Sequence, residues 1–207
     1  MNFFKTQTAE LRTVWQVGYG PEVKRTAIAF VILVVFSFGL SLALPNLRDT
    51  VMGYVMNLFG GMDVLDENGR ISALFLFSNN LQACVTVMLW GLLPFLRFPA
   101  LSLGTNAMLL GVLAAHYAAN GLSLAVYFAA LLPHAIFELP ALVLAIAMGL
   151  FVCGQLSRRC RKDETAIPLW DCFTHISRLL LVALVPLLVA AALMEAYVTP
   201  WIVSFFQ

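Results

Sequence analysis

The stretch LLPHAIFELP, residues 131–140, places a histidine and a glutamate in one of the most apolar parts of the chain. His134 and Glu138 are four residues apart, so the two side chains share one face if this piece is helical. Ionisable groups are costly in an apolar setting unless they are paired. The pair could relay protons or ions, supply half of a metal site, or act as an acid and a base. It could equally be a polar clamp that joins two helices.

The composition indicates which solvent surrounds the chain. Of the 207 residues, 61% are hydrophobic and only 11% are charged, whereas a soluble domain carries roughly 25% charged residues. So few charges cannot cover a water-exposed surface, and lipid is therefore the main solvent. This excludes a soluble enzyme. The net charge of +1 gives no sign of nucleic-acid binding either.

Five apolar stretches predict the fold class. A helix needs about 20 apolar residues to cross the hydrocarbon core of a bilayer, so we predict an all-α, polytopic transmembrane helix bundle. Residues 26–207 form this single domain, and residues 1–25 form a cytoplasmic amphipathic segment before it. The predicted spans are about 26–44, 71–93, 99–116, 122–156 and 176–198, with Pro45 closing the first and Pro200 the last.

The positions of the basic residues predict the orientation. Lysine and arginine are enriched in cytoplasmic loops, and they cluster before the first span, between the second and third, and around the start of the fifth. This pattern places the N-terminus in the cytoplasm and the C-terminus outside the cytoplasmic (inner) membrane of a bacterium. Residues 3–17 and 46–65 are expected to lie along the two membrane surfaces. Only Arg48 and Arg70 fall in the loop after the first span; the clustered basic residues are Lys5, Arg12, Lys24, Arg25, Arg97, Arg158, Arg159, Arg161, Lys162 and Arg178.

The fourth predicted span is too long for one crossing. A helix of 30 residues is ~45 Å long, while the hydrocarbon core is ~30 Å thick. Pro133 and Pro140 lie within this span, and each removes a backbone donor and crowds the preceding turn. We therefore predict a broken or kinked helix near these prolines. Discontinuous helices of this kind often form binding sites in transporters.

Three asparagines occur at similar predicted depths in neighbouring spans. Asn79 and Asn80 lie in the second span and Asn106 in the third. Polar groups at membrane depth usually face the interior of a bundle. We therefore predict one intramembrane polar cluster of these asparagines with His134 and Glu138, which is either structural or binds a ligand or ion.

The remaining reactive residue types give weaker signals. Glu195 lies near the outer end of the last span, where we expect it to be solvated. The four cysteines, which form no CxxC pair, are expected to be packing or surface thiols. No serine-protease order, HExxH motif or phosphate-binding loop is present. We therefore predict no catalytic residue, no metal and no cofactor. The cysteines are Cys84, Cys153, Cys160 and Cys172.

The segment LLPHAIFELPALVLAIAMGL resembles the signature of the stage II sporulation protein M family, and residues 75–120 are similar to an earlier part of that family's pattern. The resemblance covers about residues 75–150. It makes Asn79, Asn80, Asn106, His134, Glu138 and Pro140 motif positions without giving them a chemical role. Two residues depart from the family pattern, because Ala135 and Ala107 stand where glycine is usual, and both add a methyl group.

The resemblance implies a function as well as a fold. The family's namesake is an integral membrane protein that organises a peptidoglycan-degrading complex. The first hypothesis is therefore a membrane scaffold for envelope or peptidoglycan-remodelling proteins, in the lipid bilayer and as a homo-oligomer. The alternative is a small homo-oligomeric transporter or channel that uses His134 and Glu138. An intramembrane metalloenzyme is a third hypothesis.

Overall fold

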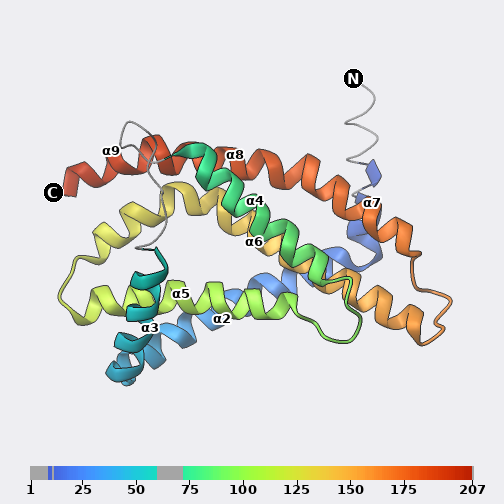
Figure 1. The fold of residues 1–207 in the computed structure, drawn as a ribbon, viewed down its shortest axis with the longest axis horizontal. Coiled ribbons are helices and arrows are strands. Elements are labelled where there is room, and N and C mark those ends of the chain that lie inside the picture. The colour runs from blue at the N-terminus through green and yellow to red at the C-terminus, as the bar shows by residue number, and fades with distance from the viewer. Residues whose placement is uncertain (1–8, 11, 60–71, 207) are drawn as a thin grey trace.

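A computed structural model describes residues 9–10, 12–59 and 72–206, and within these ranges every regular element is a helix. Five helical segments are long and apolar enough to cross a membrane. This confirms the predicted fold class. The five are α2 (Gly20–Ala43), α4 (Ala73–Trp90), α5 (Pro99–Ala119), α6 (Leu124–Cys160) and a final run from Leu169 to Phe206 (Figure 1).

The last segment is one long helix with two wider turns in it. It begins with α7 (Leu169–Leu179) and continues through α8 (Val185–Leu193) and α9 (Thr199–Val203) to a short 3₁₀ turn, η4 (Ser204–Phe206). Two π-helical turns join these pieces, η2 (Leu180–Leu184) and η3 (Met194–Val198). Pro200, which we expected to close this span, lies inside the helix. The helix absorbs the proline because the turn before it is π-helical.

The N-terminal part adds two shorter elements. A π-helical turn, η1 (Trp15–Tyr19), leads into α2 and lies against α6, where the buried Tyr19 hydroxyl donates to the Leu144 carbonyl at 2.9 Å. Helix α3 (Pro45–Phe59) begins at Pro45 and packs against α2 and α5. The predicted surface segments 3–17 and 46–65 are thus helical where they are described, and residues 3–8, 11 and 60–65 lie outside the described residues.

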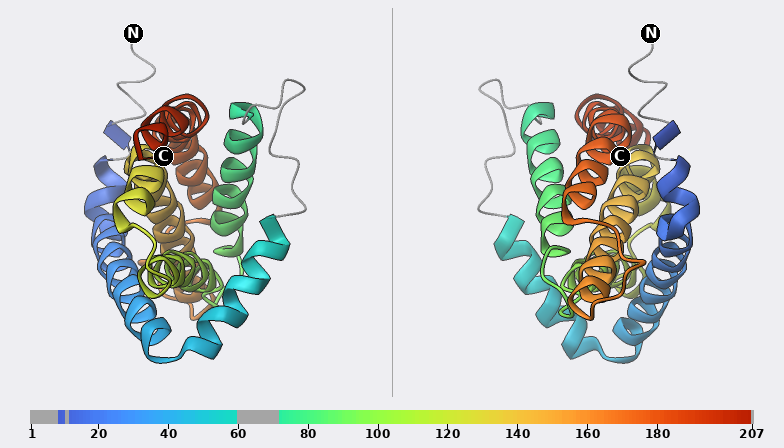
Figure 2. Two further views of the ribbon diagram at one scale, coloured as in Figure 1. Left: turned by 90° about the vertical axis from the view of Figure 1, so that its left-hand side faces the viewer. Right: turned by 90° about the vertical axis from the view of Figure 1, so that its right-hand side faces the viewer.

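Helix α6 is the centre of the bundle. In its most apolar window 61% of the residues are buried, against 17–28% for the other four spans. It contacts α2, α4, α5 and α8. End-on views show α2 and α4 on opposite flanks with α6 between them (Figure 2). Groups on α6 can therefore meet groups from most of the bundle.

The predicted break in the fourth span is a kink. Helix α6 is continuous over 37 residues and includes both Pro133 and Pro140, and its axis bends sharply partway along (Figure 1). A continuous helix of this length is ~55 Å long, so the bend lets it fit beside shorter spans. His134 and Glu138 lie between the two prolines, on the stretch that the bend positions.

Two close helix contacts depend on glycine. A Cβ on Gly149 of α6 would lie 2.6 Å from the carbonyl oxygen of Val87 on α4, and a Cβ on Gly111 of α5 would lie 2.6 Å from the carbonyl oxygen of Val34 on α2. Small residues let membrane helices approach closely, where dispersion contacts replace the hydrophobic effect. These glycines set the spacing of α4, α5 and α2 around α6.

Candidate functional site

Three ionisable side chains meet where α6 faces the last helix. His134, Glu138 and Glu195 each offer a donor atom, and these atoms all lie within 4.8 Å of one another. His134 and Glu138 are one turn apart on α6, with Nε2 of the histidine 3.9 Å from Oε2 of the glutamate. Glu195 comes from η3 on the last helix. The site therefore joins two segments that are about 60 residues apart in the chain.

Glu195 owes its position to the π-helical turn that precedes Pro200. In this turn the Thr199 N–H donates to the Met194 carbonyl, five residues back, and the Thr199 hydroxyl donates to the same carbonyl at 3.1 Å. Proline crowds the carbonyl four residues before it, and a widened turn relieves this crowding. Such π turns are frequent at functional sites. The expectation that Glu195 is solvated at a helix end is wrong, because the residue is half-buried in the cluster.

In the described part of the chain, no lysine or arginine is paired with the cluster. Among the described residues, neither Glu138 nor Glu195 forms an ion pair with lysine or arginine. The distance of 3.9 Å between His134 and Glu138 is too long for a hydrogen bond. The second ring nitrogen of His134, Nδ1, is buried and has no hydrogen-bond partner in the described part of the chain. Two carboxyl groups and an unsatisfied imidazole thus share one intramembrane position.

The predicted asparagines lie elsewhere in the bundle. Asn79 lines a groove of about 330 Å³ between α4 and α5, which Ser102 also lines. Asn106 donates to the Ser102 carbonyl at 2.9 Å, one turn back on its own helix. Asn80 is half-buried on α4. The structure therefore brings His134 and Glu138 together as predicted and adds Glu195, while Asn79 and Asn106 form a second polar group around Ser102.

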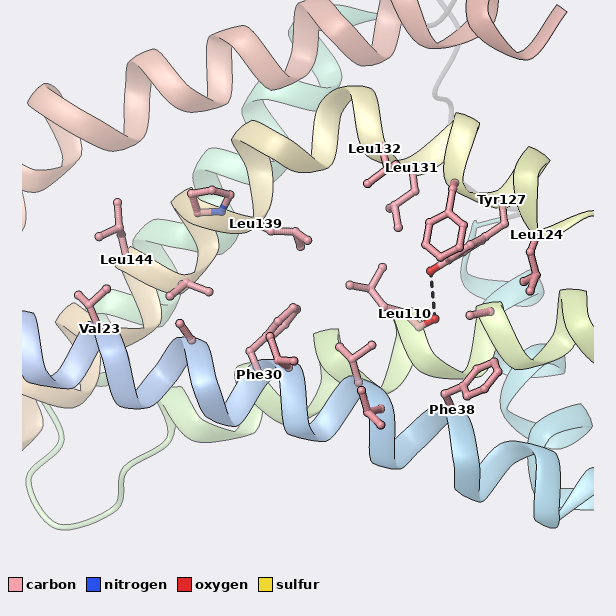
Figure 3. A pocket seen from close by; sticks show the side chains of 18 residues that line it. Val23, Phe30, Phe38, Leu110, Leu124, Tyr127, Leu131, Leu132, Leu139 and Leu144 are labelled. Carbon is pink, nitrogen blue, oxygen red and sulfur yellow. Dashed lines mark hydrogen bonds between the residues drawn. The ribbon is translucent and has the colours of Figure 1, made fainter. Parts of the chain in front are cut away.

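A larger groove on the other side of α6 is apolar. It has a volume of about 860 Å³ and is lined by side chains of α2, α5 and α6. Figure 3 shows Phe30, Leu131 and Leu139 pointing into it, with the Tyr127 hydroxyl donating to the Leu110 carbonyl at 3.1 Å at one end. Apart from the Tyr127 hydroxyl, which is engaged in that hydrogen bond, the lining residues are apolar, so the ionisable cluster is the better candidate site.

The links between α4 and α5 and between α6 and α7 pack on each other at one end of the molecule (Figure 1). The Phe95 N–H donates to the Ser157 hydroxyl at 2.8 Å, and the Arg161 guanidinium lies 5.5 Å from the centroid of the Phe95 ring. Phe95, Arg97 and Lys162 are the non-glycine residues with positive φ in the described chain, at 69°, 45° and 61°. This backbone conformation is uncommon outside glycine, so both links hold specific shapes. We call this surface, residues 91–98 and 157–165, the basic end.

An ionic network fixes the second link of the basic end. Asp163 accepts from the Thr165 hydroxyl at 2.6 Å and from Arg158 Nε at 2.8 Å, and Arg158 also contacts the Thr165 hydroxyl. The hydrogen bond from Thr165 and then that from Arg158 lower the pKa of the Asp163 carboxyl to about 2. The carboxylate is therefore charged at every physiological pH, and the network persists.

The cysteines are thiols, as predicted. Cys84, Cys153 and Cys172 are buried, and Cys160 is exposed at the basic end. Cys84 lies on α4, which contacts both α6 and α8. Glu195 was missed as a site residue although its sequence context, a single acid in a long apolar span, carried the same signal as Glu138.

A bundle of five apolar helices, packed around a central helix that carries half-buried ionisable groups, defines a multi-pass membrane protein. The sequence model of the stage II sporulation protein M family matches residues 26–200, and the chain belongs to this family. No curated protein and no solved structure shows a significant match to the chain.

Proposed function

We propose that the protein is an integral membrane scaffold of the bacterial inner membrane, and that its basic end is the surface on which partner proteins assemble. The observation that supports this most directly is the packing of two links into one shaped surface, through Phe95, Ser157 and Arg161. Links that only connect helices need no contact with each other. Family membership over most of the chain is consistent with an assembly role.

The chemistry of the basic end indicates the kind of partner. Arg97, Arg159 and Lys162 are exposed there, while Arg158 is bound to Asp163. Exposed arginines on a shaped surface favour acidic protein segments, because the planar guanidinium binds carboxylates in a bidentate way. We propose that the partners present an acidic segment at the membrane surface and belong to the envelope-remodelling machinery. We also propose that the scaffold is a homo-oligomer.

The native Cys160 gives a direct test of orientation. Because the basic end is expected to face the cytoplasm and the other three cysteines are buried, a membrane-impermeant maleimide should label Cys160 in inside-out vesicles and leave it unlabelled in intact cells. Labelling should disappear in the C160S variant. Labelling of intact cells at Cys160 would reverse the proposed orientation.

Site-specific cross-linking tests the scaffold function. A photo-activated amino acid placed at Arg97 or Lys162 should give discrete adducts with the same partner in native membranes, or with a second copy of the chain. The matched control carries the same amino acid at Asn120, which is exposed at the opposite end and should give no such adduct. Equal adducts at Asn120, or none at any position, would contradict the proposal.

A second candidate function is transport or a channel, and the ionisable cluster favours it. Acidic residues at membrane depth often form ion or proton relays. This function predicts flux of protons or ions into liposomes under a gradient, with loss of that flux in Glu138→Gln while the fold persists. Unchanged flux in a stable Glu138→Gln variant would contradict it.

A further inference from the structure

The ionisable cluster has the donor set and the charge of a metal site. Glu138 and Glu195 together carry two negative charges when ionised, and His134 adds a neutral nitrogen ligand. A divalent cation bound by these three groups makes a neutral assembly, whereas two unpaired carboxylates in a lipid-surrounded bundle are costly. No lysine or arginine among the described residues supplies this compensation.

The geometry supports coordination better than a direct ion pair. All three donor atoms lie within 4.8 Å of one another, and the ligands of a tetrahedral ion at about 2.0–2.1 Å lie roughly 3.4 Å apart. The separation of 3.9 Å between His134 Nε2 and Glu138 Oε2 therefore needs to close by about half an ångström around such an ion, and a pair at the limit of 4.8 Å by about 1.4 Å. Both glutamates can make that adjustment by side-chain rotation.

A second observation concerns the histidine of the cluster. The Nδ1 atom of His134 is buried and has no partner in the described chain, and buried polar atoms normally have one. His175 has a similarly unsatisfied Nδ1 but belongs to no group of three donors among the described residues. His134 differs from His175 because its other ring nitrogen, Nε2, lies 3.9 Å from Oε2 of Glu138 and because the residue belongs to the group with Glu195.

We propose that His134, Glu138 and Glu195 bind one divalent transition-metal cation of the Zn²⁺ or Mn²⁺ class, with one nitrogen and two oxygen ligands. Imidazole selects against Ca²⁺ and Mg²⁺, which prefer all-oxygen sites. Three protein ligands leave at least one position for water or another ligand. The cation joins the bent stretch of α6 to the last helix. This site is separate from the basic end, so it goes beyond the scaffold function.

The test uses the full-length protein, purified in detergent and stripped of metal with a chelator. Zn²⁺ and Mn²⁺ are added separately, and bound metal is measured by elemental analysis after gel filtration, with affinity measured by calorimetry. We expect about one ion per chain and a rise in the melting temperature, because a ligand that binds only the folded state stabilises it. Co²⁺ in the same site should give visible d–d bands that report its coordination number.

Variants locate the ion. Glu138→Gln and Glu195→Gln should each weaken binding at least tenfold, whereas Glu195→His should keep Zn²⁺ binding because it supplies another nitrogen ligand. His175→Asn and Glu22→Gln are matched controls of the same residue types outside the cluster and should bind like the wild type.

Two outcomes would overturn the metal site. One is wild-type protein that binds less than about 0.1 ion per chain at 100 µM metal, which needs no variant to interpret. The other is unchanged affinity in Glu195→Gln, since the proposed site requires that carboxylate. If the wild-type protein binds no metal, while the variant with the photo-activated amino acid at position 97 still cross-links to a partner, the metal site alone is rejected and the scaffold function stands.

Discussion

Gly149→Ala is expected to destabilise the folded protein by roughly 2–3 kcal/mol, because it overpacks the contact between α6, α4 and the start of α5. A Cβ at this position would lie 2.6 Å from the Val87 carbonyl oxygen and 2.8 Å from Cγ of Pro99. The first of these atoms belongs to the backbone and the second to a proline ring, so neither can rotate away. Gly91 of the α4–α5 link also lies against the backbone of Gly149.

The change in stability is large enough to measure directly. A loss of 2.8 kcal/mol corresponds to about a hundredfold change in the ratio of folded to unfolded protein. Unfolding by SDS in mixed micelles, followed by circular dichroism, gives the free energy of unfolding for each variant. Gly149→Ala should also lower the yield of monodisperse protein after extraction, since α6 is the helix that the other spans contact.

Gly154→Ala is the matched control for this prediction. Gly154 lies on the same helix, and a Cβ there would meet nothing within 4 Å. Alanine restricts the unfolded chain more than glycine does, so this variant should be neutral or more stable by about 0.5–1 kcal/mol. Equal stabilities for Gly149→Ala and Gly154→Ala would contradict the close packing of α4 against α6.

The spans were predictable because their signal is physical and strong. An 18-residue apolar run has few alternatives to a membrane helix, and the helices α2, α4, α5 and α6 begin and end within about six residues of the predicted bounds. His134 and Glu138 were also predictable as neighbours, since their spacing fixes a common helix face. The kink of α6 followed from its length and its two prolines.

The partners of these groups were not predictable in the same way. A short asparagine side chain can bond to its own helix, and Asn106 does so through the Ser102 carbonyl. The position of Asn106 in the sequence does not show whether its side chain bonds to its own helix or to another helix across the bundle. Whether the five predicted polar residues bind a ligand stays a prediction. The structure places His134 with Glu138, places Asn79 and Asn106 near Ser102, and leaves Asn80 in neither group.

Glu195 shows a second reason why the full set of site residues could not be predicted from the sequence. A proline in an apolar helix can end it, kink it or widen the preceding turn, and each outcome rotates the neighbouring residues differently. The last helix contains two π turns, and each ends two residues before a proline. The first ends at Leu184, before Pro186, and the second ends at Val198, before Pro200. The face on which Glu195 lies depends on these turns, which a count of 3.6 residues per turn does not capture.

Pro200→Ala is therefore expected to weaken metal binding by about 10- to 100-fold, the range typical for losing the support of a metal ligand. Alanine supplies the N–H that proline lacks and removes the crowding of the Ala196 carbonyl. The π turn can then return to α-helical geometry, in which the Thr199 N–H donates to the backbone carbonyl of Glu195 rather than to that of Met194. That change rotates the residues on one side of the turn by about 100° relative to the other side, and it turns Glu195 away from His134 and Glu138.

The measurement separates this effect from a loss of folding. Calorimetric titration of Zn²⁺ gives the dissociation constant, and the melting temperature of the metal-free protein should stay the same or rise, because the variant gains a helical hydrogen bond. Pro186→Ala is the matched control: Pro186 follows the other π turn of the same helix. Helix α8, which packs against α6, lies between that turn and Glu195, so we expect the rotation to fall on α7 and metal affinity to stay at the wild-type value. Metal affinity that stays at the wild-type value in Pro200→Ala would show that the π turn does not position Glu195. A fall in both variants would mean that the whole last helix, rather than its final π turn, sets the site.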